Sequence, residues 1–284
     1  MRKIFTMLLL VATFAATAQQ NPPLPVDPEV RTGKLENGLT YYIRHNGQPE
    51  NRADFYIAQK VGSMQEEDNQ AGLAHFLEHM AFNGTKNYPG KAMLNYLQDN
   101  GIKFGTNINA YTSFDETVYY ISDIPTNNQN LVDSALLVLH DWSNAIALEE
   151  EELENERGVI REEWRTRGGA QQRLWDQLLP KMYPDSKYAN RMPIGSIDVI
   201  NNFKPEEIRA YYHKWYRPDL QGIIVVGDFD LDEMEQKVKA LFSPIKLEEE
   251  RAERVYYPVP DNKEPLVAFA TDKEARSTQL MLFY

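Results

Sequence analysis

The chain has 284 residues, a formal net charge of −12 and no cysteine. The acidic excess disfavours nucleic acid or an anionic membrane surface as a partner, because both carry negative charge. Without cysteine there is no disulfide, so any metal site must use histidine and carboxylate ligands. The length suffices for one large globular domain and part of a second.

The N-terminus has the pattern of a secretory signal peptide. A basic start precedes an apolar stretch over 4–16, and the small residues Ala16 and Ala18 mark a cleavage site. The apolar stretch is shorter than a membrane-spanning helix, and no later segment is long enough to span a bilayer. We therefore predict a signal peptide over 1–18 and a mature protein that is exported, in bacteria to the periplasm.

Residues 19–245 carry the periodicities of one α+β domain. Asn37-Gly38 predicts a type I′ hairpin, and the next helix is expected from an N-cap at Asp68 or Asn69 to a stop at Asn83-Gly84. Other strands are expected over 39–43, 53–61, two parts of 103–123, and 222–229, and other helices over 90–100, 131–146, 149–167, 171–182, 205–216 and 231–242. This order predicts a two-layer sandwich in which helices pack on an antiparallel or mixed sheet.

The C-terminal residues differ from the domain before them. A charged linker over 246–254 leads to a strand-rich segment that begins near Val255 and ends in the apolar run 280–284. A strand this apolar needs partners to bury it. We interpret residues 246–284 as a linker and the truncated start of a second, similar α/β domain, and the chain as the N-terminal part of a longer protein.

The segment 75–79, His-Phe-Leu-Glu-His, is the strongest functional signal. On a helix, positions i and i+4 share a face, so His75 and His79 can bind one metal ion. The carboxylate of Glu78 then lies beside the metal, where a general base for a metal-activated water belongs. The pattern is the inverted form of the zinc-protease helix motif.

A solvated helix face is the alternative interpretation of this segment. The neighbouring residues argue against it, because most of them are apolar: Leu73, Phe76, Leu77, Met80 and Phe82. Burying such a segment would leave its imidazoles and carboxylate unsatisfied unless something binds them. The segment therefore favours a metal site.

A catalytic zinc usually takes three protein ligands, so the two histidines need one more. The acidic helix expected over 149–167 offers many carboxylates, most of which suit a solvated face. Glu156 and Glu163 lie two helical turns apart on one face, whereas Glu162 points about 100° away from Glu163. Spacing alone does not choose between Glu156 and Glu163.

Three blocks of the sequence together resemble a known family. They are HFLEHMAFNGT at 75–85, NAYTS at 109–113 and ERGVIREEW at 156–164. This combination resembles the pitrilysin, or insulinase, family (M16) of zinc metallopeptidases, and most of all its bacterial periplasmic branch. The similarity extends from about Gly33 to Phe242.

The resemblance implies a role for each matching residue. His75, His79 and Glu163 would bind one Zn²⁺ per chain, Glu78 would be the catalytic base, and Glu156 would support the ligands. The edge strand with Asn109, Ala110 and Tyr111 would bind substrate as an added β-strand. Family enzymes close a chamber from two halves, so a C-terminal half or partner subunit is expected in addition to these residues.

The function predicted from these residues is a zinc-dependent endopeptidase acting on peptides or unfolded polypeptides. Zinc would acidify a bound water and polarise the scissile carbonyl, while Glu78 would take the water proton and pass it to the leaving amine. A non-catalytic peptide-binding subunit of the same fold is the alternative, and a zinc-storage protein fits less well because ligands cluster at one ordered site. The same ligands tolerate Mn²⁺ or Co²⁺.

Overall fold

The computed structural model describes residues 25 and 27–283. The predicted signal peptide over 1–18 lies outside the described residues. By its internal contacts the chain divides into two units, residues 1–30 and 31–284. The second unit contains all the described helices, strands β2 to β6, and β1 from Arg31 onwards.

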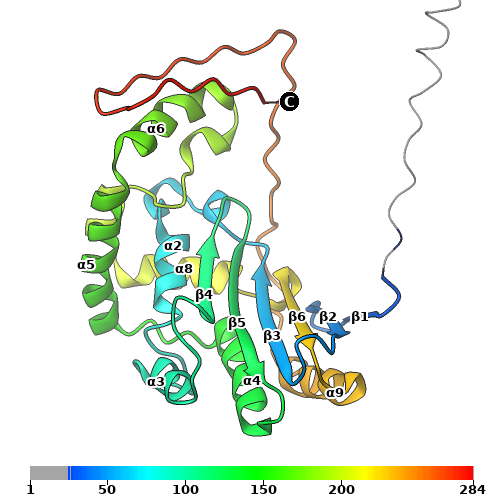
Figure 1. Ribbon diagram of the computed structural model, residues 1–284. Helices are drawn as coiled ribbons and strands as arrows, with labels where there is room; N and C mark the ends of the chain where they lie inside the picture. Colours follow the sequence, from blue (N-terminus) through cyan, green and yellow to red (C-terminus); the bar gives the residue numbers. More distant parts are fainter. Residues whose placement is uncertain (1–24, 26, 284) are drawn as a thin grey trace, which may run out of the picture. The chain divides into compact units, whose positions relative to one another are not determined.

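Six strands form a single sheet in the order β1-β2-β6-β3-β5-β4 (Figure 1). The strands are β1 (Val30–Lys34), β2 (Thr40–His45), β3 (Arg52–Gln59), β4 (Ile108–Thr112), β5 (Thr117–Pro125) and β6 (Gln221–Gly227). β2 and β6 run parallel, whereas β3 pairs antiparallel with both β5 and β6, and β4 pairs antiparallel with β5. The sheet is mixed, which confirms the predicted α+β class.

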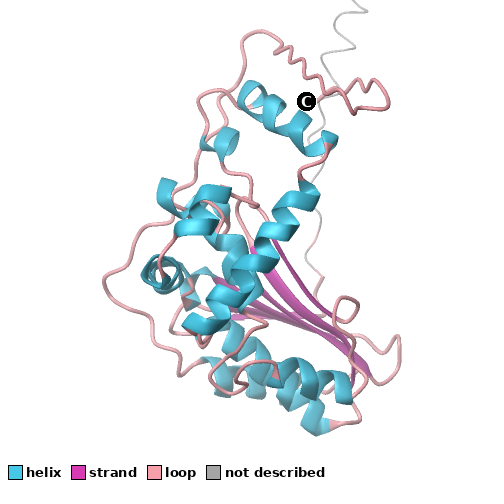
Figure 2. Cartoon of the chain, turned by 90° about the vertical axis from the view of Figure 1, so that its left-hand side faces the viewer, coloured by secondary structure: helices cyan, strands magenta, loops and turns pink. Residues whose placement is uncertain are grey.

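The helices lie to one side of the sheet (Figure 2). The α-helices are α2 (Leu73–Met80), α3 (Ala92–Asp99), α4 (Gln129–Asn144), α5 (Glu150–Arg167), α6 (Ala170–Met182), α7 (Ile197–Asn202), α8 (Pro205–Trp215) and α9 (Leu231–Phe242). Four short 3₁₀ helices are also described: η1 (Ser63–Gln65), η2 (Asp68–Gln70), η3 (Lys187–Asn190) and η4 (Pro218–Leu220). No helix in the described part of the chain is both long enough and apolar enough to cross a bilayer.

Strand alternation places the core between the sheet and these helices. In β3 the side chains of Ala53, Phe55 and Ile57 are buried, and the residues between them are only partly covered. α4 packs against β3 and β5 on this buried face, and the fully buried Trp142 of α4 stacks on Tyr119 of β5 with ring centroids 5.3 Å apart. One face of the sheet is therefore buried against the helices, and the other is partly exposed to solvent.

The hairpin turn expected at Asn37-Gly38 forms, but its geometry differs from the predicted type I′ turn. The N–H of Gly38 donates to the carbonyl of Leu35 (2.9 Å), so Glu36 and Asn37 are the central residues of the turn. A type I′ turn needs positive φ at both central residues, but here only Gly38, which follows them, has it, at φ +91°. The tight turn forms where expected with different geometry.

The helix that carries the two histidines begins later than expected. Asp68 and Asn69 belong to the 3₁₀ helix η2, and the N-cap of α2 is Gly72, at φ +105°. The hydrogen-bond acceptor at the start of this helix lies further upstream, because the buried Glu66 carboxyl group accepts from the N–H of Ala74 (2.9 Å). A polar residue in the right sequence position does not cap a helix if the backbone turns away first.

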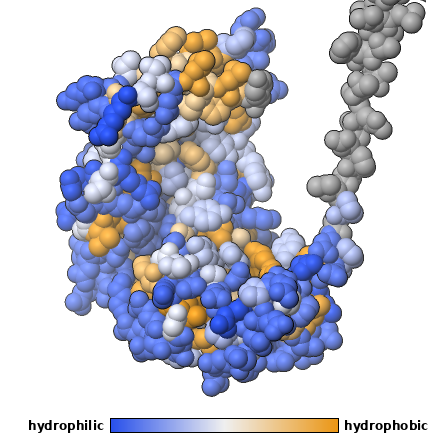
Figure 3. Space-filling view, in the orientation of Figure 1, coloured by the Kyte–Doolittle hydropathy of each residue, from blue (hydrophilic) through white to orange (hydrophobic). Residues whose placement is uncertain are grey.

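The strand expected near Val255 does not form. Residues 246–283 contain neither helix nor strand, because no neighbouring strand supplies hydrogen bonds to them. Part of this segment lies along α6, where Arg173 binds Asp272 (2.7 Å) and Lys181 donates to the carbonyl of Phe269 (2.6 Å). Exposed apolar side chains between Leu266 and Phe283 gather over α6 (Figure 3). The boundary at residue 246 stays a prediction.

Candidate metal centre

α2 presents both histidines of the motif on one side. Its apolar residues Leu73, Phe76 and Leu77 are fully buried, which sets the rotation of the helix about its axis. The rings of His75 and His79 therefore meet edge to face, with centroids 4.8 Å apart. The His75 side chain is 8% exposed and that of His79 is 24% exposed, so both lie at the base of the site.

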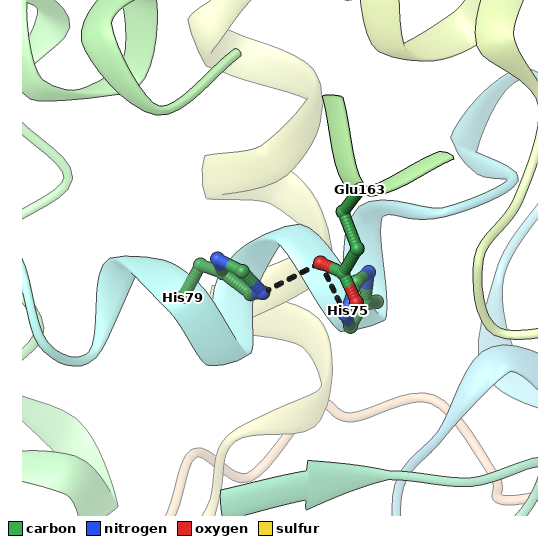
Figure 4. Close-up of side chains that lie close together, drawn as sticks. All are labelled: His75, His79 and Glu163. Atoms are coloured by element: carbon green, nitrogen blue, oxygen red, sulfur yellow. Dashed lines mark ion pairs between the residues drawn. The ribbon is translucent and has the colours of Figure 1, made fainter. Parts of the chain in front are cut away.

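α5 brings Glu163 to these two rings. Glu163 Oε2 lies 3.3 Å from His79 Nε2 and 3.6 Å from His75 Nε2 (Figure 4). Zinc–ligand bonds of about 2.1 Å in a tetrahedron put two ligand atoms roughly 3.4 Å apart, which agrees with both distances. Among residues 25 and 27–283, these three are the only group of three or more His, Cys, Asp or Glu side chains close enough together to hold a metal ion.

Glu156 lies behind the site on the same face of α5. Its Oε1 is 2.8 Å from His79 Nδ1, which turns the other ring nitrogen of His79 towards Glu163. Its Oε2 accepts a hydrogen bond from Asn83 Nδ2 (2.6 Å), and Asn83 Oδ1 in turn accepts one from Lys91. The two glutamates that spacing alone did not separate thus have different positions, one facing both histidines and one supporting a single histidine from behind.

Glu78 points to a different partner from the three clustered side chains. It is buried, and its Oε2 accepts a hydrogen bond from Thr112 Oγ1 (2.5 Å) at the end of β4. Burial raises the pKa of the Glu78 carboxyl, and the Thr112 hydrogen bond works in the opposite direction. A carboxyl with raised affinity for protons beside a metal site has the properties of a general base.

Asn109, Ala110 and Tyr111 all belong to β4, the outermost strand of the sheet. Tyr111 is 47% exposed, and its hydroxyl donates to Glu116 (2.9 Å). Asn109 Oδ1 accepts from the N–H of Ala110 (2.9 Å). α2 contacts β4, so this strand runs close to the histidine helix, and no other strand in the described part of the chain pairs with its outer edge.

Comparison with known proteins identifies the family. Residues 42–192, more than half of the chain, match the profile described as "Insulinase (Peptidase family M16)". The chain belongs to this family. Residues 202–284 match a second profile, described as "Peptidase M16 inactive domain". The suspected resemblance to the M16 family is thereby confirmed.

Similar M16 proteins include two named "Probable zinc protease PqqL". The Escherichia coli protein is 37% identical over 287 residues, covering 100% of this chain and 30% of its own length. The Haemophilus influenzae protein is 38% identical over 243 residues, covering 84% of this chain and 26% of its own length. This M16 chain therefore spans about a quarter to a third of the length of these two relatives.

A solved structure supports the fold. The first half of the periplasmic protease PqqL from Escherichia coli matches this M16 chain with a TM-score of 0.79 and 38% identity. The match covers 84% of this chain and 50% of that one. Both PqqL relatives are named as zinc proteases.

The electrostatics of the site favour a positive charge between the carboxylates. The hydrogen bond from His79 lowers the pKa of Glu163 to about 2, and Arg167, 2.6 Å from Glu163 Oε1, helps to keep it ionised. Burial alone would lower the pKa of His79, but the hydrogen bonds with Glu156 and Glu163 raise it to about 9. A metal cation and a proton would be stabilised by the same two carboxylates.

The pKa of His75 is shifted in the opposite direction from that of His79. Burial and the nearby charge of His79 lower the pKa of His75 to about 4, so its imidazole is neutral and able to donate a lone pair. A metal-bound histidine usually donates its second ring N–H to a neighbour, and His79 has such a neighbour in Glu156. His75 departs from this pattern, because its Nδ1 is buried without a partner in the described part of the chain.

Sequence reasoning missed three residues that support the site. Asn83 was interpreted only as the end of a helix, Lys91 received no role, and Thr112 was noticed only as part of a resembling block. The available signal was an asparagine directly after an apolar helix, because a polar amide buried with such a helix needs hydrogen-bond partners. Spacing could not have named those partners, because they come from other elements.

Proposed function

We propose that this chain carries the metal site and the catalytic base of a zinc-dependent endopeptidase. His75, His79 and Glu163 would hold one Zn²⁺. The observation that carries the proposal is the meeting of Glu163 Oε2 with both Nε2 atoms, at 3.3 and 3.6 Å. Two imidazole rings and one carboxylate are the ligand set of many catalytic zinc sites.

A bound zinc ion would supply a water molecule of lowered pKa and polarise the scissile carbonyl. Glu78 accepts the proton of that water and later returns it to the leaving amine. Its burial supports this role, because a carboxylate removed from bulk water binds a proton more tightly. Glu156 and Asn83 hold the ring of His79 in one orientation throughout.

The free edge of β4 supports binding of an extended peptide. The backbone of Asn107 and Ser113 bonds towards β5, since Ser122 N donates to Asn107 O (2.8 Å) and Ser113 N donates to Glu116 O (2.8 Å). Backbone groups alternate along an antiparallel strand, so those of Ala110 and Thr112 face the free edge. A peptide paired there is recognised through its backbone, which suits unfolded polypeptides of varied sequence.

We further propose that activity needs more protein than these 284 residues. The two PqqL relatives are more than three times as long, and the chain matches 50% of the solved first half of the Escherichia coli protein. Residues beyond the chain, or a partner subunit, would close the substrate chamber. The N-terminal pattern and the relative described as periplasmic together support a periplasmic location.

A peptide-binding subunit without hydrolytic activity is the second candidate function. The free edge of β4 would serve it equally well. Glu78 distinguishes the two functions, because a binding subunit has no use for a buried carboxylate beside two histidines. The proposal therefore depends on what Glu78 does.

Glu78→Gln in the full-length protein tests the proposal. Glutamine keeps the size and can still accept from Thr112, but it cannot take a proton, so peptide cleavage should fall by at least about 10²-fold to 10⁴-fold. Zinc content after dialysis should stay near one per chain in wild type and in this variant, and should fall in His75→Ala. Near-normal turnover of Glu78→Gln with zinc retained would reject the mechanism, and equal zinc content in His75→Ala would reject the metal site.

A further inference from the structure

The Glu78 carboxylate is held at one oxygen only. In the part of the chain that the structure describes, its single side-chain hydrogen bond comes from Thr112 Oγ1 to Oε2, at 2.5 Å. Oε1 accepts no hydrogen bond from these residues. It is not fully buried either, so it stays accessible to solvent. The two oxygens are therefore in different situations, one occupied by a hydroxyl and one open.

Thr112 is itself held in a fixed position. It is the last residue of β4, opposite Thr117 of β5. The turn that follows is tied to the segment before α2, because Ser63 N donates to Ser113 O (3.1 Å) and Met64 N donates to Phe114 O (2.8 Å). The end of β4 and the start of the histidine helix therefore keep a constant relation.

Gly62 allows this close approach. A Cβ atom added to Gly62 would lie 2.3 Å from the carbonyl oxygen of Ser113, nearer than atoms can pack. The other side of the turn is held as well, since the side chain of Asp115 accepts from the hydroxyl of Tyr188 and its carbonyl accepts from Arg254 (3.2 Å). The Thr112 backbone thus has little freedom to move relative to Glu78.

The side chains at the two ends of this hydrogen bond differ in stiffness. Threonine is β-branched and has few χ1 rotamers, so a fixed backbone also fixes its hydroxyl. Glutamate has three side-chain torsions, and the last of them is broad. Without Thr112, the Glu78 carboxylate could rotate and would present its oxygens in several orientations.

We propose that Thr112 is a positioning residue for Glu78, and that it directs Oε1 to the reacting water by holding Oε2. This inference rests on the proposed function of Glu78 as the base. It also links substrate binding to proton transfer, because the strand whose free edge would pair with the peptide is the strand that orients the base. The side chain of Thr112 serves the base while its backbone faces the substrate edge.

The test uses the full-length zinc-loaded protein with an unstructured peptide as substrate. Thr112→Val has nearly the same shape without the hydroxyl, and it should lower kcat by about 10-fold to 10²-fold, the usual cost of misplacing a reacting group. KM should change little, because the backbone of β4 remains. Thr112→Ser keeps the hydroxyl and should recover most of the lost kcat.

Controls separate positioning from a general loss of structure. Zinc affinity and melting temperature should match wild type in both Thr112 variants. Thr117→Val is the matched control, because it removes the hydroxyl of the cross-strand neighbour, which bonds to the Val61 carbonyl and not to Glu78. A crystal structure of Thr112→Val should show the Glu78 carboxylate rotated from its wild-type orientation.

Each outcome decides the inference. A kcat of Thr112→Val equal to that of wild type would overturn it, as would an equal loss in Thr112→Ser, an equal loss in Thr117→Val, or an unmoved Glu78 carboxylate. Glu78→Gln is measured beside these variants. Full activity of Glu78→Gln would overturn the proposed function and this inference together, whereas an inactive Glu78→Gln with a fully active Thr112→Val overturns the inference alone.

Discussion

Three glutamates of α5 allow one chemical change to be compared in three environments. Glu163 Oε2 faces both histidines, Glu156 Oε1 contacts only His79, and Glu162 is exposed and paired with Arg165. Replacing each by glutamine preserves size and removes charge. The ranking of zinc affinities then reports which carboxylate is the ligand, and helix stability changes little among the three.

The structure sets the expected magnitudes. Glu156→Gln keeps one oxygen for His79 or Asn83 but loses the charge behind the ring, and losing such a supporting group costs about 10-fold to 100-fold in metal affinity. Glu163→Gln replaces the charged ligand carboxylate itself by a neutral amide, so the loss should exceed about 10²-fold. Glu162→Gln should leave zinc affinity unchanged, because its side chain contacts neither histidine.

Competition titration against a chromophoric chelator, at fixed pH and salt, measures all three affinities. Melting temperatures of the zinc-free proteins check that each variant folds. A larger loss in Glu156→Gln than in Glu163→Gln would show that Glu156 is the ligand and that the packing of α5 on α2 has been misinterpreted. Equal affinities in all three variants would reject this metal site.

Two more predictions concern other parts of the chain. Burial raises the pKa of Glu66 to about 8, so between its usual pKa of 4.5 and 8 the folded protein keeps a proton that the unfolded chain releases. The free energy of unfolding should therefore fall as pH rises through this window, by about 1.4 kcal/mol per pH unit at most. Urea unfolding between pH 5 and 8 measures this dependence. The fall in free energy with pH should be weaker in Glu66→Gln than in wild type, and unchanged in the exposed control Glu67→Gln. Residues 19–284 alone should bind zinc but cleave an unstructured peptide at least about 10²-fold more slowly than the full-length protein, because groups that stabilise the oxyanion are expected outside them; comparable turnover, with Glu78→Gln as the blank, would contradict this.

Local periodicity determined much of this protein. The spacing of apolar residues predicted the helix over 231–242 with the bounds that the structure has, and it predicted β2, β3 and β6 to within two residues at each end. The interval between His75 and His79 already placed both rings on one helix face, because the α-helix repeats every 3.6 residues. Such features depend only on neighbours along the chain.

Tertiary packing decided how those faces meet. Glu156 and Glu163 share one face of α5, and only the crossing of α5 over α2 puts one of them against both histidines and the other behind His79. The same holds for Thr112, which reaches Glu78 because β4 ends beside α2. Long-range contacts of this kind depend on how separate elements pack, and a repeat measured within one element carries no information about the position of another.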